Sequence, residues 1–483
     1  MAENNIMEKI AALCKRRGFI FQSSEIYGGL NGFWDYGQLG AELKRNLRDT
    51  WWRAMTRERE DVEGLDAAII MHPNIWKASG HTETFADPMV DCKTCKGRFR
   101  ADQLAQIPCP QKSSKPVADC DGEKTGARPF NLMFQTYTGP IQSEENIAYL
   151  RPETAQAIFV QFKNVLESSR QKLPFGICQI GKAFRNEINP RNYIFRSREF
   201  EQMELEFFIK PDEVIEKIHG SVAKWHEGAD LSTPQPNWGW EMWHRYWVDQ
   251  RVKYYESIGL GRDALDFYWQ KKEELAHYAK ATVDILFKFP FGTEELEGIA
   301  ARGNYDLTQH SKFVGKPQDY FDEDTKTRYI PHVIEPSAGL DRLALAVITN
   351  AYHEETITDA KGKTETRVIM RFHPRIAPFK AGVFPLLKNK PELVAKAREV
   401  HRLLKPHMNC FYDEAGSIGR RYARQDEAGT PFCVTVDFET LEGVKDGADS
   451  GKKDTVTLRH RDTSAQERVS ISDLLGKLLP AIS

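Results

Sequence analysis

The sequence predicts a mixed α and β protein that ends in a separate α/β domain. Three observations predict this: a polar β-hairpin near residues 184–208, a charged and aperiodic stretch at 353–366, and alternating strand-like and helix-like segments after that stretch. The 483 residues leave room for about three domains. We therefore expect one domain over 1–352, a linker over 353–366 and a compact domain over 367–483.

Composition is typical of a globular protein, with 41% hydrophobic and 28% charged residues. The formal net charge of -2 gives no overall attraction to polyanions, so any nucleic-acid contact would need local basic patches. The chain starts with a polar segment and contains no apolar run of the length that spans a membrane. We expect a cytoplasmic protein without a membrane segment.

The hairpin, 184–208, carries more charge than a purely structural element needs. Arg185 and Glu187 are two residues apart and would project from one face of an extended chain. On the returning strand, one face is polar and the other mostly apolar. Either the polar face meets a ligand, or it is a solvated surface with cross-strand ion pairs. The polar face holds Phe200, Gln202, Glu204 and Glu206.

An amphipathic helix is predicted where leucine or tryptophan recurs every four residues, at Leu39, Leu43, Leu47 and Trp51. This apolar face could belong to the core or to a contact with a second subunit. Periodicity does not separate the two.

Four cysteines gather in a segment near 91–128 that we interpret as an insertion. Cys92 and Cys95 would share one tight turn, and Cys109 and Cys120 could complete a tetrahedral zinc site. The second pair is widely spaced, so reduced thiols are an equal alternative. The other four cysteines are scattered singly and do not indicate a disulfide scaffold.

Two further segments place charge beside apolar elements. A helix is predicted from Arg151 to Pro174, with Pro152 in its first turn and Glu153 at its N-terminal end, where a carboxylate also complements the helix dipole. In an extended segment, Glu335 and Ser337 would share a face before a helix that Gly339 opens. That helix carries Asp341 and Arg342, for which a buried structural ion pair is the alternative.

Tryptophan is concentrated between 220 and 270, which predicts an inserted, mostly helical subdomain. The next segment, beginning ELAHYA, is expected to be a helix that leads into an acidic strand and a Gly-rich turn after Arg302.

Together, the segments GLNGFWDYGQLGAELKRN, RPETAQAIF, FRNEINPR, FRSREFEQMELEFF, ELAHYA and YIPHVIEPSAGLDR resemble the class II aminoacyl-tRNA synthetases, and most closely the homodimeric glycyl-tRNA synthetases. The resemblance covers nearly the whole chain. It implies a catalytic domain with an antiparallel sheet and helices, a C-terminal α/β anticodon-binding domain, and a dimer interface around 32–55. It also implies tRNA(Gly) and glycine as partners, with ATP and Mg²⁺ as cofactors.

The resemblance further implies roles for individual residues. Arg185 and Arg342 would be catalytic at the phosphates, Phe200 would stack on adenine, and Glu295 would lie near Mg²⁺. The implied ATP-binding residues are Arg185, Asn186, Glu187, Phe195, Arg196, Ser197, Arg198, Glu199, Phe200, Glu295, Leu296, Gly339, Leu340, Asp341 and Arg342. The implied glycine-binding residues are Arg100, Glu153, Phe200, Glu201, Gln202, Met203, Glu204, Arg302, Glu335, Pro336, Ser337, Ala338 and Gly339.

The expected function is therefore an ATP-dependent glycine–tRNA ligase. One alternative is a nucleic-acid-binding accessory protein that keeps the fold without its chemistry. Another is a related class II synthetase for threonine, proline, serine or histidine.

Overall fold

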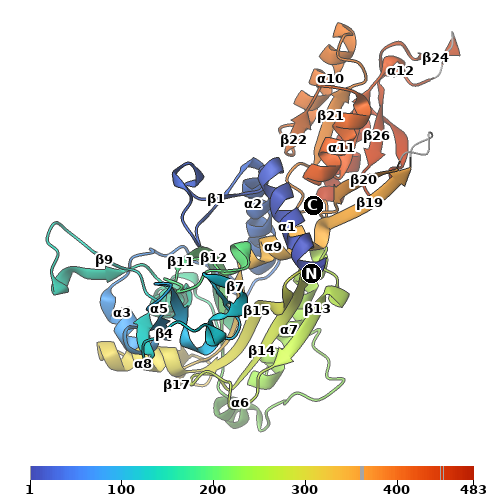
Figure 1. The fold of residues 1–483 in the computed structure, drawn as a ribbon. Helices are drawn as coiled ribbons and strands as arrows, with labels where there is room; N and C mark the ends of the chain where they lie inside the picture. Colours follow the sequence, from blue (N-terminus) through green and yellow to red (C-terminus); the bar gives the residue numbers. More distant parts are fainter. Residues whose placement is uncertain (1, 359–363, 446–447, 450) are drawn as a thin grey trace.

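The computed structural model describes residues 2–358, 364–445, 448–449 and 451–483 (Figure 1). Its larger part is built on a seven-stranded sheet of order β13-β14-β15-β18-β12-β11-β3. Neighbouring strands are antiparallel except for β11 and β3. The bounds are β3 Val62–Gly64, β11 Phe175–Phe184, β12 Glu199–Ile209, β13 Leu265–Trp269, β14 Ala281–Phe289, β15 Gly292–Gly303 and β18 His332–Gly339.

The two faces of this sheet are covered differently. One face packs into the main core with α1 (Ala2–Arg17), α2 (Gln38–Trp52), α7 (Trp240–Ser257) and α9 (Leu340–Ala351). On the other face, α5 (Ala155–Ser169) and α8 (Tyr305–Val314) cover only the end near Phe175, Phe208 and Val333. The rest of that face is left for a cavity.

The apolar stripe of α2 belongs to the core of its own chain. Leu39, Leu43, Leu47 and Trp51 are all buried within a single chain. The core alternative for this stripe is therefore the one that the structure shows.

The Trp-rich segment is not a separate helical insertion, contrary to expectation. Only α7 is a long helix there, and Trp243 and Trp247 pack on Phe207 of β12. The segment ends in β13, an edge strand of the main sheet. The aromatic rings gather because they fill the space between α7 and the sheet. Nor is ELAHYA helical: residues 271–280 form a loop that leads into β14.

The cysteine-bearing segment folds as small sheets beside the loop that joins β11 and β12 (Figure 1). The Asn189 amide donates to the carbonyl of Arg98, and the Arg100 amide donates back to Asn189, which ties the two parts together. Its strands are β4 Ala86–Asp91, β5 Arg98–Arg100, β6 Pro108–Cys109, β7 Lys112–Pro116 and β8 Arg128–Asn131. A projecting arm follows, formed by β9 Gln135–Tyr137 and β10 Ile147–Tyr149.

The C-terminal part has its own five-stranded sheet, β22-β21-β23-β26-β27, and a separate apolar core. Its strands are β21 Ala381–Pro385, β22 Cys410–Tyr412, β23 Phe432–Val436, β26 Thr455–His460 and β27 Gln466–Ser470. Its helices are α10 Pro391–Leu404, α11 Ile418–Ala428, α12 Phe438–Glu442 and α13 Leu474–Ile482.

The predicted linker at 353–366 is not irregular where it is described. β19 (Tyr352–Thr358) pairs with β20 (Thr364–Met370) as an antiparallel ribbon between the two sheets, and 359–363 lie outside the described residues. The charges that suggested a linker suit this ribbon because Glu354 is exposed. Arg367 of β20 pairs with Asp426 of α11, which joins the ribbon to the C-terminal part.

The remaining elements are short. They are β1 Ile20–Gln22, β2 Trp34–Tyr36, α3 Pro73–Ala78, α4 His81–Thr84, α6 Asp212–His219, β16 Tyr320–Asp322, β17 Thr327–Tyr329, β24 Val444–Lys445 and β25 Ala448–Asp449. Among the described helices, none combines the length and the apolar character needed to cross a membrane.

Candidate active site

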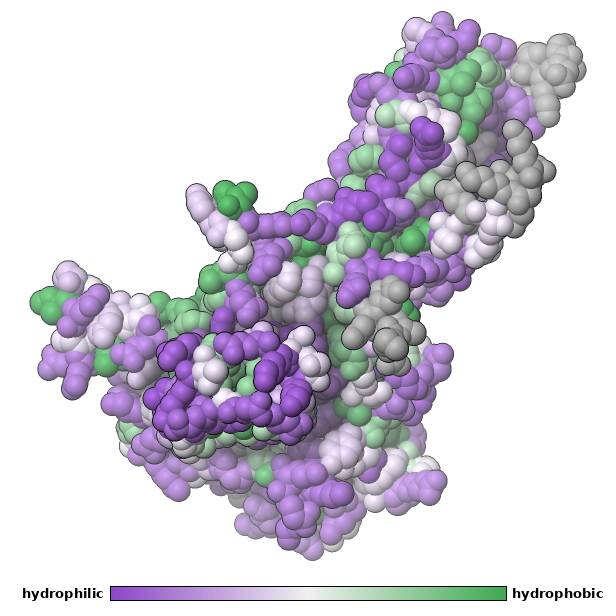
Figure 2. All heavy atoms as spheres, viewed as in Figure 1, coloured by the Kyte–Doolittle hydropathy of each residue, from purple (hydrophilic) through white to green (hydrophobic). Residues whose placement is uncertain are grey.

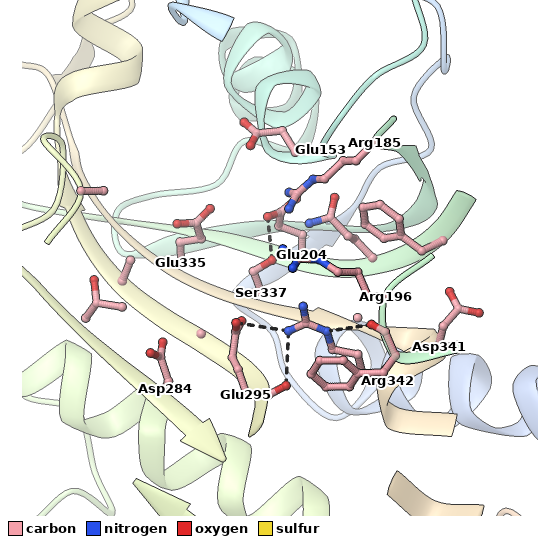
Figure 3. A pocket seen from close by; sticks show the side chains of 18 of the residues that line it. Glu153, Arg185, Arg196, Glu204, Asp284, Glu295, Glu335, Ser337, Asp341 and Arg342 are labelled. Atoms are coloured by element: carbon pink, nitrogen blue, oxygen red, sulfur yellow. Dashed lines mark hydrogen bonds and ion pairs between the residues drawn. The ribbon is translucent and has the colours of Figure 1, made fainter. Parts of the chain in front are cut away.

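A cavity of about 510 Å³ lies over the uncovered face of the seven-stranded sheet (Figure 3). Strands β12, β15 and β18 supply its floor, and the loop after β11 supplies one wall. The predicted site residues that line it are Glu153, Arg185, Glu187, Phe195, Arg196, Ser197, Phe200, Gln202, Glu204, Glu295, Arg302, Glu335, Ser337, Gly339, Asp341 and Arg342.

Strand alternation removes several predicted residues from the cavity. On β12, Glu199, Glu201 and Met203 point to the opposite face from Phe200 and Glu204. There, Glu201 pairs with Lys44 and Arg48 of α2, and Met203 lies in the core. Glu199 pairs with Lys182 of β11 instead.

The same alternation applies to the segment around β18. Pro336 and Ala338 are buried on the face away from the cavity, while Glu335 and Ser337 line it. Leu296 and Leu340 are completely buried in the core. These four residues are next to lining residues in the sequence, but their side chains do not reach the cavity.

Three polar residues that were predicted to bind ligand form hydrogen bonds or ion pairs within the protein. Arg198 donates to the carbonyls of Glu187 and Asn31, which fixes the loop. The backbone amide of Asn186 donates to the carbonyl of Leu132, and Asn186 is not among the residues that line the cavity. Arg100 pairs with Asp87 and Asp102, each at 2.7 Å, outside the cavity.

One end of the cavity is rich in carboxylates. Glu204 accepts hydrogen bonds from Thr154 and from Ser337, the latter at 2.8 Å. Glu153 does not sit within a helix as predicted, because α5 begins at Ala155. The backbone amide of Thr154 donates instead to Gln202, so the chain turns and Glu153 faces the cavity.

Burial and neighbouring charges together shift the pKa values of these carboxyl groups. Burial raises the pKa of Glu204, and the nearby charge of Glu153 raises it further. Burial also raises the pKa of Glu335 to about 8, even though Arg302 opposes this change. For Glu153, His81 and Arg302 outweigh burial, and its pKa lies well below the usual range. Positive ligands would relieve the repulsion between Glu204 and Glu335.

Arg302 organises this end of the cavity. It donates to both oxygens of Asp306, at 2.9 and 3.0 Å, and to Glu335 at 2.7 Å. The ring of Tyr278 covers its guanidinium at 4.0 Å. The two carboxylates that it binds are buried with it, so Arg302 holds Glu335 in a fixed position.

The other end of the cavity is rich in arginine. Arg185 lies 5.4 Å from the ring centre of Phe200 and donates to the carbonyl of Pro152. Arg342 lies against the ring of Phe195 and pairs with Glu295 at 3.2 Å (Figure 3). Arg196 and Glu187 form a third pair at 3.2 Å. This end presents three cations beside two aromatic rings, which suits a nucleotide.

Asp341 lines the cavity and also anchors the elements around it. It accepts hydrogen bonds from Tyr36 and Lys44 and from the backbone amide of Glu201. Burial would raise its pKa, but Lys44 and Tyr36 outweigh burial and the pKa is lowered. The charged carboxylate therefore anchors the first turn of α9, on which Arg342 stands.

Several lining residues were missed, most of them on β14 and the loop before it. Asp284 of β14 and Tyr278 of the loop before it both line the cavity. The alternation in the TVDILF segment could have indicated Asp284. The missed residues are Ile194, Gln270, Glu274, Ala276, Tyr278, Thr282, Asp284, Gly298 and Ala300.

Comparisons with known proteins agree with this arrangement. Residues 137–352 match the family described as tRNA synthetase class II core domain (G, H, P, S and T), and residues 380–480 match the anticodon binding domain. A glycine–tRNA ligase of Thermobifida fusca is 49% identical over 98% of this chain and 97% of its own length. The chain belongs to the glycine–tRNA ligase family.

Other members of this family are similarly close. The glycine–tRNA ligase of Treponema denticola is 49% identical over 98% of this chain and 96% of its own, and that of Thermus thermophilus is 45% identical over 98% of both. The class II fold, the anticodon-binding domain and the aminoacyl-tRNA ligase predicted from sequence are thereby confirmed.

Proposed function

We propose that this chain joins glycine to tRNA(Gly) in two steps. A carboxylate oxygen of glycine attacks the α-phosphorus of ATP, and pyrophosphate leaves. The terminal ribose hydroxyl of the tRNA then attacks the carbonyl carbon of the adenylate, and AMP leaves. The observation that carries the proposal is one cavity with arginines and aromatic rings at one end and buried carboxylates at the other.

The arginine end is assigned to ATP. Negative charge develops on the phosphates during the first step, and Arg185 and Arg342 are positioned to stabilise it electrostatically. Phe200 would stack on the adenine, and Glu187 would accept a hydrogen bond from its amino group. No side chain needs to form a covalent intermediate, because positioning and electrostatics supply the acceleration.

The carboxylate end is assigned to the ammonium group of glycine. Glu153, Glu204 and Glu335 line this end, and Ser337 and Arg302 keep two of them in place. Alanine would need space for one more methyl group between rigid, buried walls. Overpacking of this kind costs about 1–3 kcal/mol, which favours glycine.

Glu295 is assigned to Mg²⁺, with Asp284 beside it. A Cβ built on Gly298 would lie 3.6 Å from an oxygen of Asp284 and 3.8 Å from an oxygen of Glu295, so both carboxylates reach the same part of the cavity floor. Oxygen donors of this kind fit Mg²⁺. When bound, the ion would neutralise phosphate charge. Glu295 already pairs with Arg342, so the two would together orient the phosphates.

The four thiols are assigned to a structural Zn²⁺. The amides of Cys95 and Gly97 donate to the sulfurs of Cys92 and Cys95, and the sulfurs of Cys109 and Cys120 are 3.3 Å apart. Amide donation from Cys95 lowers the pKa of Cys92, which favours the thiolate that zinc binds. Among the described residues, no three of the sulfurs lie within 4.8 Å of one another, so closure around an ion would need the thiols to move closer together. Reduced thiols remain the alternative.

We also propose a cytoplasmic homodimer. A loop before α2 exposes apolar side chains, with Ile26 88% and Tyr27 86% exposed. In Figure 2, hydrophobic atoms stand out on the projecting loop between β1 and β2. Such side chains suit burial against a second copy, next to the expected interface at 32–55.

Glycine-dependent exchange of pyrophosphate into ATP tests the proposed function. Replacing Arg185 by Ala should slow the exchange about 100-fold or more, because transition-state charge then loses a donor. Arg328→Ala is the matched control, since the Arg328 side chain is 62% exposed on β17, outside the cavity and the expected interface. Exchange that needs no glycine, or that survives Arg185→Ala, would refute the proposal.

A further inference from the structure

Behind the carboxylate end of the cavity lies one more acidic residue, Glu206, which is completely buried. It is on β12, two residues beyond Glu204 and on the same face of the strand. It does not line the cavity. Among the described residues, neither oxygen of Glu206 has a hydrogen-bond partner. A carboxyl group in this position is therefore neither solvated nor paired.

Glu206 is nevertheless close to two residues of the site. Oxygens of Glu204, Glu206 and Glu335 all lie within 4.8 Å of one another, and all three groups are buried. Glu204 already accepts from Ser337 and Thr154, and Glu335 accepts from Arg302. Among these three carboxyl groups, Glu206 is therefore the one without a described donor of its own, and a hydrogen on it would lie close to both other carboxylates.

Among the described residues, none forms an ion pair with Glu206. The charge of Arg302 on β15 acts on Glu206, but its described hydrogen bonds go to Asp306 of α8 and Glu335 of β18. On β11 the paired residue is the apolar Ile177. An unpaired charge in such a place is very costly, and a buried carboxyl normally takes a proton instead.

We propose that Glu206 is a positioning residue that stays protonated and donates its hydrogen bond to Glu335 or Glu204, so that these two carboxylates face the glycine ammonium. This inference rests on the proposed function. Burial raises the pKa of Glu206 well above the usual range, and Glu335, Glu204 and Asp306 raise it further against the effect of Arg302. The proton is retained when glycine binds.

Two substitutions separate a protonated Glu206 from an ionised one. Glu206→Gln keeps a neutral donor of the same shape, and Glu206→Leu removes the donor. In the exchange assay, the KM for glycine should rise less than about threefold in the Gln variant and more than about tenfold in the Leu variant, while the KM for ATP stays near the wild-type value. Glu167→Gln, on the exposed face of α5, is the matched surface control.

The pH profile adds a measurement that a merely structural role would not change. In the wild type, protonation of Glu335 raises the KM for glycine as the pH falls, which gives the pH profile an acid limb. In Glu206→Leu this limb should move to higher pH, because the anionic form of Glu335 loses a hydrogen bond. In Glu206→Gln this limb should stay in place. If the Gln variant loses glycine affinity as strongly as Glu204→Gln, or if the limb moves to lower pH, Glu206 is ionised and the inference is wrong.

Infrared spectroscopy tests the proton directly, even if the Leu variant does not fold. The difference spectrum between wild type and Glu206→Gln at neutral pH should contain the carbonyl band of one protonated carboxylic acid, with and without glycine. A difference spectrum with only carboxylate bands would overturn the inference. Wild-type protein without glycine-dependent exchange would refute the proposed function instead, so the two failures are distinguishable.

Discussion

Arg302 donates a hydrogen bond to Glu335 at 2.7 Å, and both side chains are almost completely buried. The same guanidinium binds Asp306 through two further donors. One planar cation thus joins β15, β18 and α8 at the floor of the carboxylate end. A lysine has one nitrogen in place of three and cannot make this bridge.

We expect Arg302→Lys to damage both stability and glycine binding. Breaking a buried ion pair typically costs about 3–5 kcal/mol, so the urea midpoint should fall clearly. The KM for glycine should rise at least tenfold, which corresponds to a loss of about 1.4 kcal/mol or more in binding free energy. Arg262→Lys on the exposed surface should change neither quantity. An Arg302→Lys protein with normal glycine KM would show that Glu335 does not depend on this bridge.

Glycine binding should weaken as the pH falls below about 8, the raised pKa of Glu335. A proton on Glu335 competes with the ammonium group, so well below this pKa the KM for glycine should rise by about tenfold per pH unit. In Glu335→Gln the KM should be high and nearly independent of pH. A wild-type KM that is flat between pH 6 and 8 would contradict this assignment.

The same group makes stability depend on pH. The folded chain holds a proton on Glu335 between the ordinary carboxyl pKa of 4.5 and about 8, whereas the unfolded chain does not. Because the folded state binds more protons in that window, the free energy of unfolding falls as the pH rises through it. The decline should be smaller in Glu335→Gln, as measured by urea unfolding at several pH values without glycine, because Glu204 and Glu206 keep their own raised pKa values.

Protein purified without added metal should contain about one zinc per chain. Replacing Cys95 or Cys120 by Ser should release the ion, because each removes one of four thiolates. Elemental analysis measures this directly, with Cys433→Ser in the C-terminal part as control. Less than about half an equivalent of zinc in the wild type would favour reduced thiols.

In solution, the mass should be twice the 55.4 kDa of one chain. Replacing Ile26 and Tyr27 together by Asp should raise the dimer dissociation constant, because both apolar side chains then carry charge into the interface. Sedimentation equilibrium measures this constant. Val314→Asp is the control, since Val314 is 58% exposed on α8. A monomeric wild type would contradict the dimer.

Sequence patterns correctly predicted which residues share a face where one strand alone decides the geometry. Alternation on β12 and β18 correctly grouped Phe200 with Glu204 and Glu335 with Ser337. The prediction failed for residues such as Glu201, which is next to a lining residue in the sequence but points to the opposite face of the strand. Arg185 was predicted on a strand, but β11 ends at Phe184 and Arg185 starts the loop.

Features that depend on distant pairing could not be predicted in this way. Asp284 reaches the cavity because β14 lies beside β15, which in turn lies beside β18, and no local pattern contains that order. The inner strand β21 was not predicted, because its five residues, AGVFP, include a glycine and a proline and show no alternation. The segment RVIMRF was expected in the C-terminal domain, but its strand β20 pairs with β19 outside the five-stranded sheet.

The most direct test of the central claim is pyrophosphate exchange with the wild-type protein, repeated with each amino acid in turn. The account predicts that glycine supports rapid exchange and that alanine, serine, threonine, proline and histidine do not. Exchange with another amino acid at a kcat/KM equal to that of glycine, or no exchange with any of them, would contradict it.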